Sequence, residues 1–152
     1  MAISMDLIKQ LRESTGARIL DCQKALQEAD GDLEKAKAIV EAKGLARVEK
    51  TQDRETKAGF IAAYVHNTGA IAAMVEVLCE TDFVAQNEEF RQLAKDIAMQ
   101  IVAMNPENLE ELLAQDFVKD PEKTVDTMVK ALSGKIGEKM EIRRFVRYQI
   151  GE

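Results

Sequence analysis

The sequence contains few of the residue types that build metal centres, disulfide frameworks and nucleophilic active sites. Its 152 residues include only two cysteines, Cys22 and Cys79, and their distant positions fit neither a metal-ligand spacing nor a disulfide framework. The single histidine, His66, has no serine or cysteine near it in sequence, so a residue that ends a strand is a simpler interpretation than a catalytic base. No glycine-rich phosphate loop is present. We therefore expect no enzymatic activity, no catalytic residue, no bound metal and no cofactor.

Long apolar runs and an excess of positive charge are also missing. No stretch approaches the roughly 20 apolar residues of a membrane-spanning helix, and the chain does not start with a basic run followed by an apolar segment. The formal net charge of -6 disfavours direct binding to nucleic acid, which depends on clustered Lys and Arg. The one basic cluster, Arg143, Arg144 and Arg147, is expected on an exposed strand face, pairing with glutamates or contacting another protein. These features predict a cytoplasmic protein that binds neither membranes nor nucleic acid directly.

The first 44 residues show the spacing of three short helices. Apolar residues recur at helical spacing after Ser4, a predicted N-cap, as far as Gly16, and again as far as Gly31. Asp32 is expected to cap a third helix that ends at Gly44. Short helices joined by tight glycine turns predict a three-helix bundle at residues 1–44.

Charged residues then dominate from residue 45 to residue 57. This composition fits either a solvated extension of the third helix or a flexible tether, and the pattern alone leaves both open. In either case it is interpreted as a linker between the bundle and a second domain.

Residues 58–152 predict an α+β core. The segments 58–65 and 70–79 alternate as two strands of an antiparallel hairpin, and Asn87 is expected to cap a long amphipathic helix. Two further helices are predicted, one at 107–114 with Pro106 before it and one from about Pro121 to Gly137. With the short helix at 107–114 left out of the order, a final strand at 140–150 completes a β-β-α-α-β arrangement with helices on one face of the sheet. Its alternation predicts one common face for Met140, Ile142, Val146, Tyr148 and Ile150.

The junction from Thr81 to Phe90 lies where the second strand stops and the long helix starts. A phenylalanine, Phe83, follows Asp82 at this turn. Two interpretations remain open from the pattern alone. Phe83 is a core residue, the usual fate of a phenylalanine, or it is directed at a partner protein.

Three sets of motifs resemble the elongation factor Ts family. The first is Leu11-Arg12-Glu13-Ser14-Thr15-Gly16-Ala17 with Asp21-Cys22-Gln23-Lys24-Ala25-Leu26, which is similar to the family's ubiquitin-associated-like (UBA-like) amino-terminal bundle. The second, from Glu76 to Phe90, resembles its central motif Glu-Thr-Asp-Phe-Val-Ala. The third, Lys135-Ile136-Gly137-Glu138-Lys139-Met140 followed by Arg143-Arg144-Phe145, resembles its carboxy-terminal helix end and strand. The resemblance covers nearly the whole chain in the expected order.

The resemblance implies a guanine-nucleotide exchange factor of translation. Its expected partner is elongation factor Tu, in the GDP-bound and the nucleotide-free states, and its action is the release of GDP by differential binding. The implied contacts are an exchange tip near the partner's magnesium and phosphate site and a second contact on the bundle. The tip comprises Thr81, Asp82, Phe83 and Val84, and the bundle contact comprises Arg12, Thr15, Gly16 and Arg18. An alternative is a helical-bundle adaptor, or a family member without exchange activity.

The chain also departs from the family pattern. Only residues 107–114 lie where members commonly carry a longer helical insertion, so the chain resembles a short form with a trimmed core. Two copies of short members commonly dimerise. Val146 occupies the position where some of them have a cysteine that joins the dimer, and monomer and homodimer both remain open.

Overall fold

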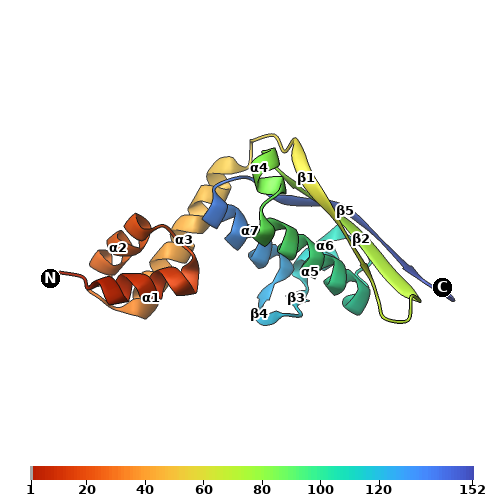
Figure 1. Ribbon diagram of the computed structural model, residues 1–152, viewed down its shortest axis with the longest axis horizontal. Helices are drawn as coiled ribbons and strands as arrows, with labels where there is room; N and C mark the ends of the chain where they lie inside the picture. Colours follow the sequence, from red (N-terminus) through yellow and green to blue (C-terminus); the bar gives the residue numbers. More distant parts are fainter. Residues whose placement is uncertain (1) are drawn as a thin grey trace.

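The computed structural model describes residues 2–152. The molecule is elongated, with a helical bundle at one end and an α+β core at the other, and the two termini lie at opposite ends (Figure 1). The described residues form two separate hydrophobic clusters, one within the bundle and one within the core. The predicted fold class, a UBA-like bundle followed by a small antiparallel sheet with helices on one face, is confirmed.

The bundle consists of α1 (Met5–Thr15), α2 (Ile19–Glu28) and α3 (Leu33–Thr51). Ser4 caps α1, because its hydroxyl accepts the amide hydrogen of Leu7 at 3.3 Å, and Gly16 ends the helix in the left-handed conformation at φ 68°. Asp32 caps α3 through the amides of Glu34 and Lys35. The cluster inside is formed by Ile8, Leu11, Cys22, Ala25, Leu26, Ala29 and Ala36.

The third helix does not end at Gly44, so that prediction is wrong. It continues to Thr51, and the charged segment is therefore a helical extension as far as that residue, followed by coil before the first strand. Val48 and Thr51 in the extension are both 5% exposed. The reason lies outside the local sequence: the extension packs along a core helix, α7 (Val125–Ile136), and tertiary packing outweighs the weak helix propensity of one glycine.

Gly44 and Gly134 lie against each other where α3 crosses α7. A Cβ on Gly134 would lie 2.6 Å from the carbonyl oxygen of Gly44, whereas a Cβ on Gly44 would lie 3.9 Å from the Cα of Gly134. The crossing therefore requires glycine on one side only.

We predict opposite effects for alanine at these two positions. Gly134→Ala forces the helices apart and should lower the free energy of unfolding by about 1–3 kcal/mol, the usual cost of overpacking. Gly44→Ala fits and should raise it by about 0.5–1 kcal/mol, because glycine is a poor residue inside a helix. Urea denaturation of both variants checks this. Equal stability of the two would contradict the crossing geometry.

The core sheet contains β1 (Ala58–Val65), β2 (Ile71–Cys79) and β5 (Glu141–Gln149), all antiparallel in the order β1-β2-β5. The long helix α5 (Glu88–Met104) packs across β1 and β2 on one face, and Asn87 caps it through the amide of Phe90 at 3.1 Å. Its predicted apolar stripe, Phe90, Leu93, Ala94, Ile97, Ala98, Ile101 and Val102, is buried throughout. The two short helices are α4 (Asp82–Ala85) and α6 (Leu109–Ala114), and the helices cover one face of the sheet (Figure 1).

Two predicted helix starts are wrong. The short helix begins at Leu109 rather than Glu107, because Asn108 caps it through the amide of Glu111. The next helix, α7, begins at Val125, where the Thr124 hydroxyl accepts the amide of Thr127 at 3.1 Å. The residues before it form β4 (Asp120–Thr124), which pairs with β3 (Asp116–Phe117). The predicted β-β-α-α-β order therefore lacked a small hairpin between the last two helices.

A β-bulge changes the faces of the last strand. Val77 pairs with Ile142 but Glu76 pairs with Arg144, so Arg143 has no partner in the register and the inward and outward alternation shifts by one residue. Phe145 consequently packs on the core, whereas Tyr148 is 74% exposed on the opposite face. The predicted common face of the strand is therefore wrong beyond the bulge.

The bulge also divides the predicted basic cluster. Arg143 and Arg144 pair with Glu76 at 3.5 and 3.4 Å, as expected for a strand face with a neighbouring glutamate. The side chain of Arg147 is only 10% exposed and donates to the carbonyl of Val102 at the end of α5. Arg147 is therefore a mostly buried residue that binds the end of α5, and it does not belong to a basic surface.

Candidate partner-binding site

The predicted exchange tip is a single helical turn that projects from the end of β2. Thr81 caps α4, and its hydroxyl oxygen accepts the amide of Val84 at 3.4 Å. Val84 and Ala85 are buried under the turn, while the Phe83 side chain is 90% exposed. The interpretation of Phe83 as a core residue is therefore wrong. A phenylalanine so exposed at a capped, anchored turn is unusual, because folding normally buries this side chain.

The turn is held from its carboxy-terminal side by α5. The Arg91 Nε donates to the carbonyl of Ala85 at 2.8 Å, which satisfies an orphan carbonyl at the end of α4. The Arg91 guanidinium also lies 4.6 Å from the ring centre of Phe60 in β1. The tip is therefore attached to both the sheet and the long helix.

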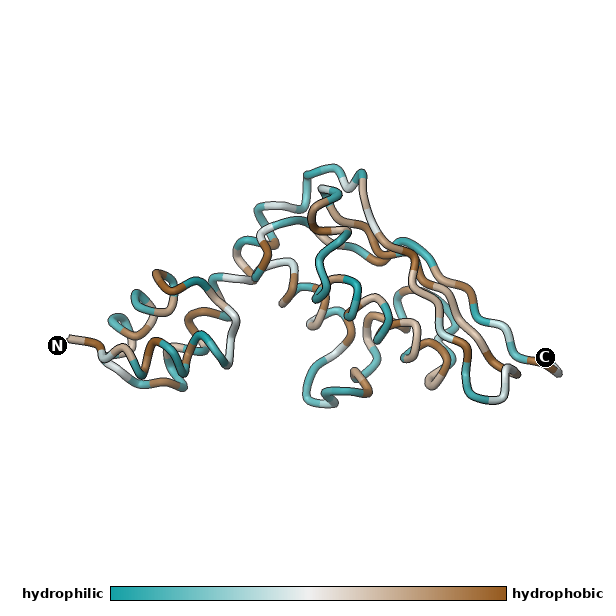
Figure 2. The backbone as a smooth tube through the Cα atoms, viewed as in Figure 1, coloured by the Kyte–Doolittle hydropathy of each residue, from teal (hydrophilic) through white to brown (hydrophobic). Residues whose placement is uncertain are grey.

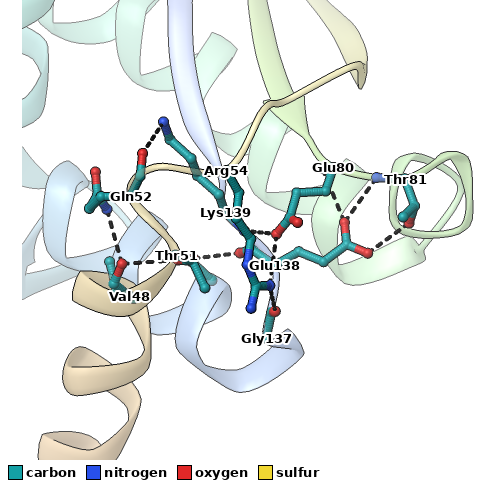
Figure 3. Close-up of polar contacts among 10 residues, drawn as sticks. Val48, Thr51, Gln52, Arg54, Glu80, Thr81, Gly137, Glu138 and Lys139 are labelled. Carbon is teal, nitrogen blue, oxygen red and sulfur yellow. Dashed lines mark hydrogen bonds and ion pairs between the residues drawn. The ribbon is translucent and has the colours of Figure 1, made fainter.

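A carboxylate from a segment distant in sequence, that of Glu138, holds the amino-terminal side of the turn. One oxygen of Glu138 accepts the amide hydrogens of Glu80 and Thr81, both at 3.1 Å, and the other accepts the hydroxyl hydrogen of Thr81 at 2.7 Å (Figure 3). Glu138 follows Gly137, the residue that ends α7. The last turn of α7 and the tip are thus joined, although they are 57 residues apart in sequence.

The same network reaches the end of the bundle helix α3. The carboxylate of Glu80 accepts from the amide of Lys139 and from the guanidinium of Arg54, and the ammonium of Lys139 donates to the carbonyl of Gln52 at 2.7 Å (Figure 3). Arg54 also donates to the carbonyl of Gly137 at 3.3 Å. These contacts connect α3, the end of α7 and the tip in one polar cluster, which sequence spacing alone did not indicate.

Cys79, at the end of β2, is not a reactive thiol. It is fully buried, and burial, with a smaller effect of the nearby Glu138 carboxylate, raises the pKa of its thiol to about 11. Its S–H donates to the carbonyl of Thr81 at 3.3 Å. The residue therefore packs as a small neutral side chain beneath the tip.

The predicted bundle contact lies at the end of α1 and in the turn that follows. Thr15 donates its hydroxyl hydrogen to the carbonyl of Leu11 at 2.7 Å and accepts the amide of Ala17, so this side chain shapes the turn. Arg12 and Arg18 are exposed on either side of it. The turn also meets the core, because the Lys135 side chain occupies the space that a Cβ on Gly16 would need.

Two apolar residues beside this turn lie on the surface and were not among the predicted contact residues. Ile19 and Leu20, at the start of α2, are 47% and 66% exposed. Both are apolar positions at the start of this helix, which the helical spacing alone does not assign to the core or to the surface. The sequence does contain a signal for their exposure: Cys22, Ala25 and Leu26 already form the apolar stripe of this helix, and they are its buried residues.

The outer face of the sheet is a second apolar surface. The helices cover only the inner face (Figure 1), and β1 and β2 consist largely of apolar residues (Figure 2). The following residues, termed the outer sheet face, are 47–74% exposed: Ile61, Val65, Met74 and Tyr148. Met74 lies at its centre, paired with Ala63 of β1 on one side and with Val146 of β5 on the other.

Across residues 2–152, no cluster of three His, Cys, Asp or Glu side chains is arranged to hold a metal ion. The same residues include no helix with the length and apolar character of a membrane span. The surfaces that stand out are the tip, the turn after α1 and the outer sheet face, each of which exposes large apolar side chains. Fold and surfaces together define a small α+β module with an amino-terminal helical bundle and exposed apolar surfaces.

Comparison with known proteins identifies the family to which this chain belongs. The family model described as "Elongation factor TS" matches residues 80–152, which include the tip, Glu138 and β5. Relatives named elongation factor Ts align with nearly the whole chain. That of Desulforamulus reducens is 40% identical over 99% of this chain and 90% of its own length, and that of Thermotoga maritima is 42% identical over 100% and 98%. The chain belongs to the elongation factor Ts family, which places it in translation elongation.

The lengths of the relatives differ from that of this chain. The alignments with the two relatives above extend over 195 residues, more than the 152 of this chain, so these relatives carry residues that this chain lacks. The relative from Aquifex aeolicus is 48% identical over 97% of this chain, which spans about half of that relative, 53% of its length.

Proposed function

We propose that the protein is a guanine-nucleotide exchange factor that binds elongation factor Tu in the cytoplasm and promotes the release of GDP. The observation that carries this proposal is Phe83, an exposed apolar side chain on a turn that is fixed at both ends. Membership of the elongation factor Ts family supports it. In the proposal, the Phe83 ring enters an apolar site of the partner near its magnesium and phosphate groups.

No catalytic group is required for this function. A protein that binds the nucleotide-free partner more tightly than the GDP-bound partner must weaken GDP binding by the same factor. Burial of one large apolar side chain contributes about 1.5–3 kcal/mol, which corresponds to roughly 10- to 150-fold in an equilibrium constant. Insertion of the ring into the nucleotide-free partner alone could therefore weaken GDP binding by up to this factor.

The four tip residues have different roles in this proposal. Asp82 and Phe83 are exposed and make the contact with the partner. Thr81 caps the turn that presents them. Val84 is 8% exposed, so it anchors the turn in the core from below.

We propose the turn after α1 as the second contact, through Arg12, Thr15, Gly16 and Arg18. Two exposed arginines beside the apolar Ile19 and Leu20 form a mixed surface of the kind that protein interfaces use. Because the bundle is joined to the core through α3, both contacts act on one partner molecule and strengthen each other.

Removal of the bundle should weaken binding without unfolding the core. A chain beginning at Thr56 retains every residue of the core cluster, so we expect it to stay folded. Its melting temperature should be lower, because α3 no longer packs against α7. Affinity for elongation factor Tu should fall at least tenfold, measured by calorimetry. Unchanged affinity would remove the bundle from the contact.

The proposed function is tested by the loss of fluorescently labelled GDP from elongation factor Tu. Addition of the protein should accelerate the loss in proportion to its concentration until saturation. A mixture with the protein unfolded by heat provides the control. An unchanged rate would favour the alternative, an adaptor or a member of the family without exchange activity.

We also propose that two copies associate through the outer sheet face. Four large side chains, three of them aliphatic and one a tyrosine, are exposed there, and two-fold symmetry would bring the same surface of a second copy against them. Val146 lies within this face, so the association relies on packing rather than on a disulfide.

A further inference from the structure

We infer that Glu138 is a positioning residue for the exchange tip, acting on the partner only through Phe83; this inference rests on the proposed exchange function. Glu138 lies after α7, while the residues it holds lie between β2 and α4 (Figure 3). Glu138 is half-buried beside the tip and is not one of the four tip residues. Its effect is to set the direction in which the turn presents Phe83.

The backbone around Thr81 explains why an acceptor is needed. The chain leaves the sheet after Cys79 and enters a helical turn at Asp82, so the amides of Glu80 and Thr81 lie outside both the β-ladder and the helix. The same oxygen of Glu138 accepts both amide hydrogens at 3.1 Å. Without this carboxylate, both donors lose their partner. Within the described part of the chain, the backbone of the junction then keeps only the bonds to the Thr81 carbonyl, from the Cys79 thiol and the Ala85 amide.

The second oxygen of Glu138 fixes the cap itself. The Thr81 hydroxyl donates to it at 2.7 Å and accepts the amide of Val84 with its lone pair. The hydrogen of this hydroxyl is thereby committed to Glu138, which leaves the oxygen free to cap α4. An acceptor with no hydrogen of its own suits all three bonds, and an ionised carboxylate meets this requirement.

Glu138 is itself held in place. The Ser133 hydroxyl donates to its carbonyl at 2.6 Å, and Gly137 before it adopts φ 86°. The amide of the next residue, Lys139, donates to the carboxylate of Glu80, so the two glutamates hold each other's backbone. Among the described residues, no Lys or Arg pairs with Glu138, so its charge serves hydrogen bonding rather than a salt bridge.

The test is a double-mutant cycle of Glu138→Ala and Phe83→Ala, measured as stimulated GDP release from elongation factor Tu. Loss of three charge-assisted bonds should slow release about tenfold or more when Phe83 is present. In the Phe83→Ala background the same change should slow release less than twofold, because no ring remains to be positioned. Glu138→Gln, which keeps one carbonyl acceptor, should fall between wild type and Glu138→Ala.

Glu141→Gln is the matched control. Glu141 lies three positions after Glu138, accepts the Thr56 hydroxyl hydrogen at 2.7 Å and does not contact the tip. The rate of GDP release stimulated by this variant should therefore equal the wild-type rate. The inference would be overturned by a wild-type rate in Glu138→Ala, or by equal slowing of release in both backgrounds, which indicates a general loss of stability.

Amide hydrogen exchange separates this inference from the proposed function. Glu138→Ala, and Glu138→Gln if the alanine variant does not fold, should speed exchange at residues 80–84 and leave the amides of α5 protected. If the wild-type protein fails to stimulate GDP release, the proposed function is wrong, and the positioning role is then judged on this pattern. Exchange that is unchanged at the tip, or faster throughout the core, would contradict it.

Discussion

Replacement of Phe83 by alanine is expected to slow stimulated GDP release from elongation factor Tu by about 10- to 100-fold, with little change in melting temperature. The ring is 90% exposed in the free protein, so its removal leaves no cavity. In the proposed complex the ring is buried, and its loss removes about 1.5–3 kcal/mol of differential binding. Stopped-flow measurement with labelled GDP checks the rate, and thermal melting checks the fold.

Two further substitutions sharpen this result. Phe83→Leu keeps an apolar side chain and should retain part of the stimulation. Phe90→Ala, at a position with 0% exposure seven residues further along, should lower stability by about 3–5 kcal/mol, as expected for a buried phenylalanine. A wild-type release rate in Phe83→Ala would show that the ring does not act on the partner.

Replacement of Met74 by glutamate is expected to abolish self-association. Met74 lies on the central strand, flanked by Ala63 and Val146, so a two-fold interface over the outer sheet face brings this position close to its symmetry mate. Two carboxylates would then have to be buried together without a partner, which costs several kcal/mol. We expect the dissociation constant of the dimer to rise at least 100-fold.

Light scattering over a range of concentrations measures this effect. Val118→Glu is the matched control, because Val118 is also apolar and 54% exposed but lies between β3 and β4, away from the sheet. The control should associate as the wild type does. A wild-type chain that stays monomeric at high concentration, or a Met74→Glu chain that still dimerises, would contradict the proposed interface.

Several helices and strands could be predicted from local patterns in the sequence. Ser4, Asp32 and Asn87 act as N-caps as predicted, because a cap depends on amides only two or three residues away. The β1-β2 hairpin and the buried stripe of α5 likewise follow from short-range periodicity. The exposed position of Phe83 did not follow from periodicity, and only the family resemblance favoured it.

The remaining features depend on contacts between distant segments. The helix α3 continues through Gly44 because this part of it packs against α7 at Gly134. The bulge at Arg143 arises from the pairing of β5 with β2. The hairpin of β3 and β4 is too short for a periodic signal. Nothing in the sequence distinguishes Glu138 from the other glutamates of the chain. Its hydrogen-bond partners, the amides of Glu80 and Thr81, are 58 and 57 positions away in sequence and lie beside it only in the folded chain.

Differential binding is tested most directly by the affinity of elongation factor Tu for GDP, measured with and without a saturating concentration of the protein. The dissociation constant for GDP should rise in its presence, by the same factor by which GDP weakens binding of the protein to elongation factor Tu. The Phe83→Ala variant should reduce that factor. An unchanged dissociation constant for GDP, with the protein demonstrably bound, would contradict exchange by differential binding.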